Sequence, residues 1–237
     1  MPTCIVIICA GAIALALFLK EKLKKYSLKA VFLKTTVSVL FVALAVCGWY
    51  AASNGRPSAL GLFIIPGLVC GLLGDIWLDL KYVFPQSDEP FTYAGFLCFG
   101  IGHILYIVGM SLQFCPRGAE VYVLVPAALG VALGFGNMLL EKPMKLDYGS
   151  MKPVAIAYGA LLFSTVLVSG SLAMLHGWHS GAMNAIFAGG ALFAVSDLVL
   201  SGTYFGKGKD RPVDIILNYL TYYPAQYLIA LSLFLLR

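Results

Sequence analysis

Residues 59–80 read ALGLFIIPGLVCGLLGDIWLDL, a run that stays apolar until two aspartates close it. A helix needs about 20 mainly apolar residues to cross the roughly 30 Å hydrocarbon core of a membrane. Because lipid offers no partners to backbone N–H and C=O groups, such a run in a membrane has to be helical. The stretch therefore predicts a membrane-spanning helix with two carboxylates, Asp75 and Asp79, in its last turns.

The rest of the chain repeats this pattern. Of its 237 residues, 60% are hydrophobic and 11% are charged, whereas about a quarter of the residues in a soluble domain are charged. We therefore expect an all-α polytopic membrane protein, with residues 1–237 forming a single transmembrane domain and no soluble domain between the spans. Eight spans are predicted, at 3–19, 31–52, 59–80, 92–112, 121–140, 154–175, 182–201 and 215–236. The N-terminal run lacks the positive residues that open a signal peptide, so we interpret it as the first span.

The distribution of basic residues predicts the orientation. One set of helix ends carries thirteen Lys and Arg: Lys20, Lys22, Lys24, Lys25, Lys29, Lys34, Lys81, Lys142, Lys145, Lys152, Lys207, Lys209 and Arg211. The other set carries three, Arg56, Arg117 and Arg237. Because cytoplasmic loops are enriched in Lys and Arg, both termini should lie outside the cytoplasm. The net charge of +5 thus reflects topology and anionic lipid headgroups, and we expect no nucleic-acid partner.

The two halves of the chain resemble each other around one acidic residue in each. Asp75 and Asp197 lie 122 residues apart, each near the end of a predicted span. Each has a glycine eight residues before it, Gly67 or Gly189, and a leucine three residues after it. This correspondence predicts two four-helix repeats, an arrangement that places a site where the repeats meet.

Ionisable and polar residues at membrane depth are costly and therefore indicate function. They gather in the half of the bilayer that carries the basic ends, with His103 somewhat deeper: Lys34, Asp75, Asp79, His103, Asp197, Asn218, Tyr222, Tyr223 and Gln226. Three of the neighbouring residues also have simpler interpretations. Asp79 can be solvated beside Lys81, Lys34 can extend to the headgroups, and Tyr219 is interpreted as part of an interfacial aromatic belt.

Other motifs in the sequence are less informative. The six cysteines have no CxxC spacing and are interpreted as small buried hydrophobic residues. His176 and His179 are three residues apart in a predicted loop, on the side away from the acids, and are interpreted as solvated. Nucleophile-elbow, Walker and zinc-protease motifs are absent from the sequence. We therefore predict neither a metal site nor a cofactor.

Two acids in a site of low dielectric constant do not ionise together easily, so one is held protonated beside a carboxylate base. This combination suits hydrolysis through an oxocarbenium-like intermediate, as in glycosidases. It suits proton-coupled transport equally well, so the carboxylates alone leave enzyme and carrier as alternatives.

Four motifs follow one another along the chain: GDIWLDL (74–80), FTYAGFLCFGIGHILYI (91–107), GGALFAVSDLVL (189–200) and YYPAQYLI (222–229). In order and spacing they resemble the YhhN-like lysoplasmalogenase family of eight-span membrane proteins. The resemblance covers predicted spans three, four, seven and eight well, and the rest through the span count. The family often has Lys-Pro at the start of its second span, where this chain has Lys34-Thr35.

The resemblance implies hydrolysis of the vinyl ether bond of a lysoplasmalogen, which gives a fatty aldehyde and a glycerophospho-ethanolamine or glycerophosphocholine. Our hypothesis assigns the acid and the base to Asp75 and Asp197, without deciding which is which. His103, Asn218, Tyr222 or Tyr223, and Gln226 orient substrate or water, and Lys34 binds the phosphate. The expected partners are a lysophospholipid substrate and membrane lipid.

The alternatives differ in what they need. A proton-coupled carrier of a lysolipid or small amphiphile would use the same acids, although carriers usually bind near the midplane. A metal-dependent amidase of the ceramidase type would need several histidines near the acids, where only His103 is expected. A purely structural protein leaves the depth-segregated acids unexplained. We expect a bacterial inner membrane, or the endoplasmic reticulum in a eukaryote, with the site toward the cytoplasmic leaflet.

Overall fold

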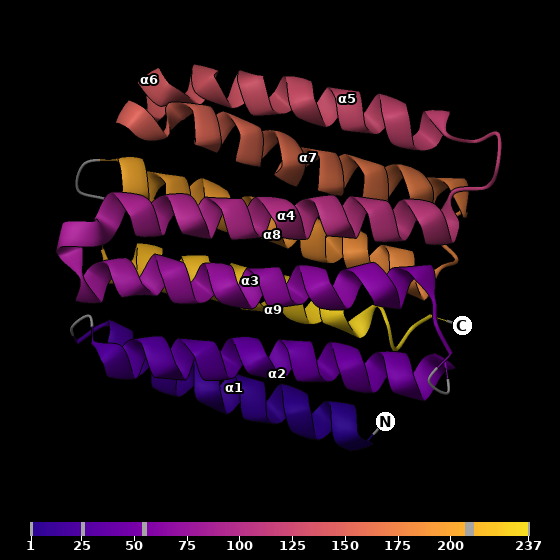
Figure 1. Ribbon diagram of the computed structural model, residues 1–237, viewed down its shortest axis with the longest axis horizontal. Helices are drawn as coiled ribbons and strands as arrows, with labels where there is room; N and C mark the ends of the chain where they lie inside the picture. Colours follow the sequence, from indigo (N-terminus) through magenta and orange to yellow (C-terminus); the bar gives the residue numbers. More distant parts are fainter. Residues whose placement is uncertain (1, 25–26, 54–55, 207–210, 237) are drawn as a thin grey trace.

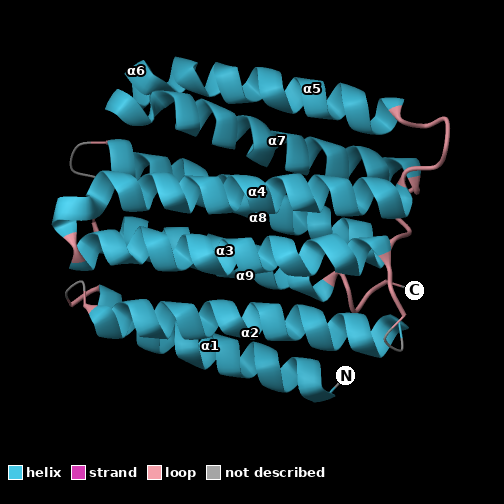
Figure 2. Ribbon diagram, viewed as in Figure 1, coloured by secondary structure: helices cyan, strands magenta, loops and turns pink. Residues whose placement is uncertain are grey.

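The computed structural model describes residues 2–24, 27–53, 56–206 and 211–236, and over these residues the protein is helical without a strand (Figure 2). The long helices are α1 (Pro2–Lys22), α2 (Leu28–Ser53), α3 (Ala59–Val83), α4 (Asp88–Phe114), α5 (Val121–Gly136), α7 (Lys152–Leu175), α8 (Gly181–Phe205) and α9 (Pro212–Leu231). A short helix, α6 (Glu141–Met144), and the 3₁₀ turns Pro85–Ser87, Asn137–Leu140 and Gly149–Met151 connect them. The predicted all-α class is confirmed.

The helices lie side by side with their axes in one common direction, and both termini lie at the same end (Figure 1). Helices α1 to α8 supply seven stretches long and apolar enough to cross a membrane. The remaining long helix, α9, runs along the same direction but opens with polar residues. Large apolar side chains face outward along the bundle, including Leu17, Phe32, Leu97 and Leu124. The protein is therefore an integral membrane protein.

Two predicted spans extend beyond the end of the observed α-helix, whereas the other six lie within theirs. The span expected at 121–140 is α-helical only to Gly136, after which the chain tightens into a 3₁₀ turn. Gly134 and Gly136 have low helix propensity at this point. The last helix begins at Pro212, not at residue 215, because proline is favoured in the first turn of a helix. It ends at Leu231, five residues earlier than predicted.

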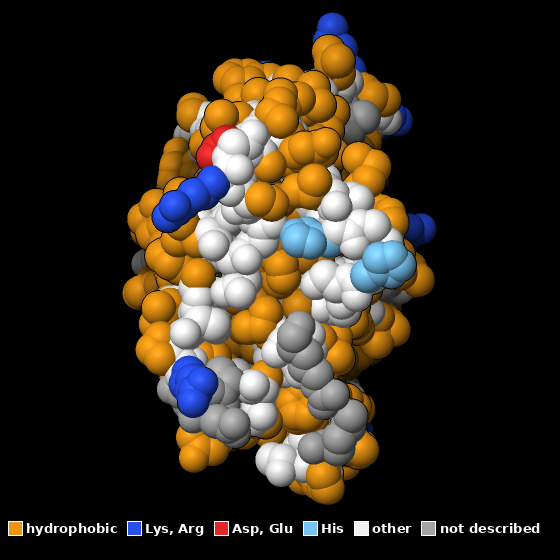
Figure 3. All heavy atoms as spheres, turned by 90° about the vertical axis from the view of Figure 1, so that its right-hand side faces the viewer, with side chains coloured by type: hydrophobic (Ala, Val, Ile, Leu, Met, Phe, Trp, Pro, Cys, Tyr) orange, Lys and Arg blue, Asp and Glu red, His pale blue; other side chains and the backbone are white. Residues whose placement is uncertain are grey.

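The end opposite the termini carries the basic loops, as the count of Lys and Arg predicts. Lys25, Lys207, Lys209 and Arg237 lie outside the described residues. The end that carries the termini shows few Lys, Arg, Asp or Glu side chains, and histidine side chains are exposed there (Figure 3). We call the opposite end the basic end.

Helices α3 and α8 share more features than their aspartates. A serine immediately before each helix caps its N-terminus. The Ser58 side chain accepts a hydrogen bond from the Gly61 backbone N–H, and the Ser180 side chain accepts one from the Met183 backbone N–H. These caps are again 122 residues apart. A side chain at Gly67 would collide with Tyr106 of α4, and one at Gly189 would collide with the Ala225 backbone of α9. The pairs α3–α4 and α8–α9 therefore pack in corresponding ways, which supports the predicted repeat.

Candidate active site

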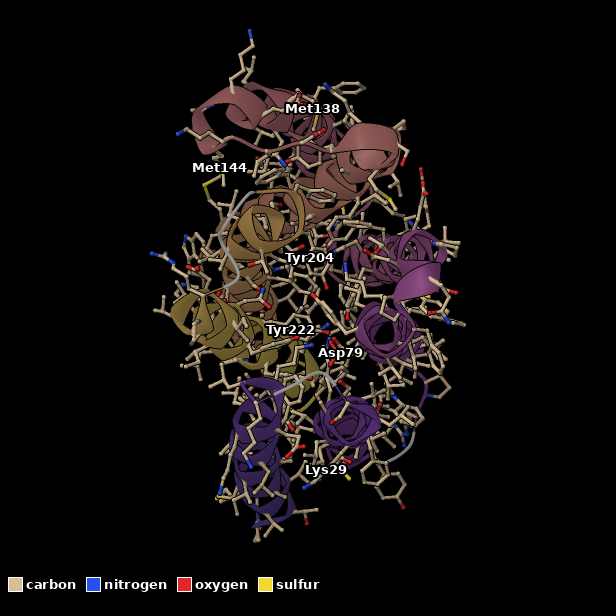
Figure 4. All side chains as sticks on the ribbon, turned by 90° about the vertical axis from the view of Figure 1, so that its left-hand side faces the viewer. Lys29, Asp79, Met138, Met144, Tyr204 and Tyr222 are labelled. Carbon is tan, nitrogen blue, oxygen red and sulfur yellow. The ribbon has the colours of Figure 1, made fainter. Side chains whose placement is uncertain are left out.

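Asp75 of α3 and Asp197 of α8 line the same cavity inside the bundle, near the basic end. Its walls come from α2, α3, α4, α7, α8 and α9. The residues that line it are Lys34, Asp75, Leu78, Phe96, Phe99, Tyr158, Phe193, Ser196, Asp197, Leu200, Tyr204, Asn218, Tyr219 and Tyr222. Viewed from the basic end, Tyr204, Tyr222 and Asp79 lie near the centre of the ring of helices, whereas Lys29, Met138 and Met144 lie at its edge (Figure 4). We call this space the aspartate cavity.

Asp75 is held by three groups from two other helices. Its Oδ2 accepts hydrogen bonds from Ser38 Oγ of α2 at 2.6 Å and from Tyr222 Oη of α9 at 2.7 Å. Its Oδ1 lies 3.2 Å from Lys34 Nζ. Ser38 and Lys34 share one face of α2 because they are four residues apart. Since each of these contacts favours the ionised carboxyl group, Asp75 is suited to remain a carboxylate.

Asp79 belongs to an ion-pair network beside the aspartate cavity. Its Oδ1 lies 2.8 Å from Lys22 Nζ of α1 and 3.3 Å from Lys34 Nζ. Only 2% of Asp79 is exposed, so the interpretation of this residue as solvated is wrong. The belt interpretation of Tyr219 is also wrong, because this ring is buried against Phe18 of α1 and its hydroxyl faces Asp79 Oδ1.

Asp197 has a different environment. Its Oδ2 accepts a hydrogen bond from the hydroxyl of Tyr158 on α7. Within the described part of the chain, no Lys, Arg or His nitrogen lies within ion-pair distance of its carboxyl group. A buried carboxyl group without a cation is more easily accommodated as the neutral acid.

The buried charges are therefore balanced on one side of the cavity and not on the other. Lys22 and Lys34 offset Asp75 and Asp79, and all four residues are at most 5% exposed. Among the described residues, Asp197 is the third buried acid, and it has no such cation beside it. Two similar residues thus acquire unlike environments, which is the arrangement that separates an acid from a base.

Two of the predicted polar residues of α9 support the cavity in different ways. Asn218 lines it and donates from Nδ2 to the carbonyl oxygen and hydroxyl of Ser196, both at 2.9 Å. Gln226 lies behind it and donates to the Tyr222 hydroxyl at 3.1 Å, while its own oxygen accepts from Tyr106. These bonds fix the direction of the Tyr222 hydroxyl toward Asp75.

His103 and Tyr223 do not line the aspartate cavity. The His103 ring packs against Tyr158 and Phe193, and its Nδ1 lies 3.1 Å from Thr165 Oγ1. Its Nε2 is buried without a hydrogen-bond partner among the described residues. The Tyr223 hydroxyl donates to the backbone carbonyl of Lys34 at 3.4 Å. Both residues form a second layer around the cavity.

Three contributors to the site were not predicted. Ser38 and Tyr158 are single hydroxyl groups in apolar runs, and their only signal is a depth similar to that of the acids. In the sequence, Lys22 is interpreted only as one of the basic residues that determine orientation.

A metal site would need a cluster of ligating side chains. Among the described residues, no three His, Cys, Asp or Glu side chains gather so that they could hold a metal ion. His176 instead pairs through Nε2 with the Phe114 carbonyl at 2.8 Å.

Comparison with known proteins adds one match. The model of the YhhN family matches residues 29–233, which cover nearly all of α2 to α9 and every residue of the candidate site except Lys22 and Phe18. No curated protein and no solved structure matches the chain significantly.

Proposed function

Because the chain belongs to the YhhN family, we propose that it is a lysoplasmalogenase, a membrane hydrolase of the vinyl ether bond of lysoplasmalogens. The observation that supports this reaction is the pair of aspartates, Asp75 and Asp197, on the wall of one cavity with unlike environments. Vinyl ether hydrolysis needs an acid that protonates carbon and a base that activates water. The charge balance supports Asp197 as the acid and Asp75 as the carboxylate.

The first step is proton transfer from Asp197 to the β-carbon of the vinyl ether. The C=C π electrons form the new C–H bond, and an oxocarbenium ion develops at the carbon bonded to oxygen. The Asp75 carboxylate stabilises this cation electrostatically. Ser38, Tyr222 and Lys34 hold that carboxylate in place, so it needs little reorganisation during the reaction.

The second and third steps return both acids to their starting states. Asp75 accepts a proton from water as the water oxygen bonds to the oxocarbenium carbon, which gives a hemiacetal. Asp75 then protonates the departing glycerol oxygen while Asp197 takes the proton of the hemiacetal hydroxyl. The C–O bond breaks, and a fatty aldehyde and a glycerophospho-alcohol leave. One water molecule is consumed and no proton is gained or lost by the enzyme.

The remaining residues position these groups. Tyr158 donates to Asp197 and stabilises the carboxylate that forms when the proton leaves. Lys34 pairs with both Asp75 and Asp79, and its positive charge favours the ionised form of Asp75. Asn218 lines the cavity and can orient the attacking water. Tyr223, Gln226 and His103 support the first layer from behind.

Substrate entry requires side-chain movement. The aspartate cavity has a free volume of about 30 Å³, enough for two or three water molecules at most. Aromatic residues, including Phe96, Phe99 and Phe193, line much of it. Their rotation would admit the vinyl ether and exclude bulk water, which strengthens the electrostatic effects inside.

We also propose that the basic end faces the cytoplasm of a bacterial inner membrane, so that the site lies toward the cytoplasmic leaflet and both termini lie outside. A fusion of alkaline phosphatase to the C-terminus tests the orientation. The fusion should be active, whereas a green fluorescent protein fusion exported by the same route should be dark. The opposite pair of results would reverse the orientation.

Measurement of the fatty aldehyde by mass spectrometry tests the reaction. The protein purified in detergent should release aldehyde from alkenyl lysophosphatidylethanolamine and not from the ester-linked lysolipid. Asp75→Asn and Asp197→Asn should each reduce the rate by a factor of about 100 or more. Asp214→Asn serves as the matched control, because Asp214 does not line the aspartate cavity and pairs with the exposed Arg211 at the start of α9.

The outcomes separate the alternatives. Aldehyde release that survives both cavity substitutions would keep the reaction and refute the assigned residues. No aldehyde from the wild-type protein would refute the lysoplasmalogenase proposal. Substrate-dependent proton flux in proteoliposomes would then favour the carrier.

A further inference from the structure

A second, more open cavity lies at the basic end of the bundle, and we call it the vestibule. It has a volume of about 510 Å³, within the usual range for small-molecule sites. Its lining comes from the end of α3, the 3₁₀ turn that follows it, the start of α4, the segment before α7 and the end of α8: Lys81, Pro85, Gln86, Asp88, Glu89, Thr92, Asp147, Tyr148, Gly149, Ser150, Met151, Tyr204 and Phe205. Unlike the aspartate cavity, it is mainly polar.

The walls of the vestibule are tied together by specific hydrogen bonds. The Tyr93 hydroxyl of α4 donates to the Ser150 carbonyl at 2.8 Å, and Ser150 Oγ donates to Glu89 Oε1 at 2.7 Å. On the other side, the Asp147 backbone N–H donates to the Phe205 carbonyl of α8 at 2.8 Å. The segment before α7 is thus fixed to both α4 and α8, so the vestibule is a built feature of the fold.

Tyr204 separates the vestibule from the aspartate cavity, because its side chain lines both. It also lines a third, mainly apolar cavity that contains Asp197 and extends between α7 and α8 past Ala155, Leu162 and Phe163. A lysolipid has three parts with matching properties: a polar headgroup, a reacting ether linkage and an apolar chain. The three cavities meet at Tyr204, and the apolar cavity also shares Tyr148 and Phe205 with the vestibule.

Lys81 lies at the inner wall of the vestibule. It is 9% exposed, and its ammonium nitrogen lies 3.6 Å from the centre of the Tyr204 ring. It also lies 3.3 Å from both Asp88 Oδ1 and Thr92 Oγ1. Among the residues listed above as lining the vestibule, it is the one cation. The ammonium group can bind a phosphate if the phosphate replaces Asp88, whose side chain is 63% exposed and free to turn outward.

The acidic residues Glu89, at the start of α4, and Asp147, in the segment before α7, also line the vestibule and are exposed, unlike Lys81. With Asp88, they outnumber Lys81 in the vestibule, so its outer part favours a positive charge. From the inside outward, the order is therefore the aspartate pair, Tyr204, Lys81 and the two outer carboxylates. An amine-bearing lysolipid presents its ether linkage, phosphate and ammonium group in the same order.

From this order we propose that the vestibule is the headgroup subsite, in which Lys81 binds the phosphate and Glu89 and Asp147 select a cationic amine. The inference rests on the proposed function and identifies the residues that determine its headgroup specificity. Tyr204 positions the glycerol end of the lipid between the two cavities. Lipids with a phosphate but no amine are bound less tightly.

Equilibrium binding tests this without requiring catalysis. Ester-linked lysophosphatidylethanolamine and lysophosphatidic acid, both radiolabelled, are titrated against the full-length protein in detergent. The wild-type protein should bind the amine-bearing lipid about 10-fold tighter, as expected for one charge-assisted contact. The double variant Glu89→Gln/Asp147→Asn should reduce this ratio to about 1, and Lys81→Met should weaken both lipids with the ratio unchanged.

The matched control is Glu141→Gln, which removes a carboxylate at the same end of the bundle but outside the vestibule. It should leave the ratio unchanged, and a thermal unfolding midpoint for each variant shows that the fold is intact. A ratio that the double variant does not change, or that Glu141→Gln changes equally, would overturn the proposal. Failure of the proposed function is a separate result, the absence of aldehyde release from any vinyl ether lysolipid.

Discussion

Tyr222 of α9 donates a hydrogen bond of 2.7 Å to Asp75 of α3, 147 residues earlier in the chain. The bond joins α3, in the first half of the chain, to α9 at the wall of the aspartate cavity. Asp75 also pairs with the ammonium group of Lys34, whereas among the described residues Asp197 has no ion-pair partner and accepts a hydrogen bond from the Tyr158 hydroxyl. This difference between the two acids is the basis of the first two predictions.

Tyr158→Phe should reduce kcat about 10-fold and leave KM nearly unchanged. The hydroxyl donates to Asp197, and this bond strengthens as negative charge develops on the carboxyl group during proton transfer. Steady-state kinetics of aldehyde release measure the effect. Tyr227→Phe is the control, since that hydroxyl donates to the Val37 carbonyl outside the aspartate cavity. A wild-type kcat in Tyr158→Phe would contradict the role of Asp197 as acid.

The rate of hydrolysis should depend on pH in a bell shape. Asp197 must carry a proton at the start of the reaction, so activity is lost as pH rises and this proton dissociates. Asp75 must be ionised, so activity is also lost as pH falls and it becomes protonated. Profiles of kcat/KM from roughly pH 5 to pH 9 measure both limbs. A flat profile would argue against a titrating carboxyl acid.

Lys22→Met and Asp79→Asn should each destabilise the protein by about 3–5 kcal/mol, because each leaves its partner as an uncompensated buried charge. The double variant removes one charge of each sign and should lose clearly less than the sum. Thermal unfolding in detergent measures this cycle. The double variant should also retain activity, since neither residue lines the aspartate cavity. Additive losses would show that the two residues do not interact energetically.

Gly189→Ala should lower the unfolding free energy by about 1–3 kcal/mol. A Cβ atom there would lie 2.8 Å from the Ala225 carbonyl oxygen, so α8 and α9 would have to separate. Gly136→Ala is the matched control, because a Cβ atom at that position meets nothing within 4 Å. It should be neutral or slightly stabilising. Equal losses in the two variants would refute the close approach of α8 and α9.

Much of the fold and part of the site could be predicted from the sequence. Hydropathy along the chain predicts the spans, because crossing lipid imposes a length and a composition on each helix. Depth also follows from position within a span, which is why Asp75, Asp197 and Asn218 could be expected at one level of the bundle. The predicted ends of the helices were less accurate, since they depend on local features such as Pro212 in the first turn of α9.

The contacts of each group could not be predicted in the same way. Depth says nothing about how a helix is rotated or which helices are its neighbours. Tyr222 and Tyr223 are adjacent in the sequence, yet one donates to Asp75 and the other to the Lys34 backbone. Tyr158 has no pattern that distinguishes it from other buried tyrosines, and only the packing of α7 against α8 brings it to Asp197.

Length, hydropathy and charge along the chain were enough to predict a helical membrane protein with acids gathered near its basic end. Which acid is paired with a cation depends on how the helices pack against one another in three dimensions. The packing of α2 against α3 brings Lys34 to Asp75, and the packing of α7 against α8 brings the Tyr158 hydroxyl to Asp197. Coulomb interactions fall with distance, so the chemistry of each acid follows from these few ångströms.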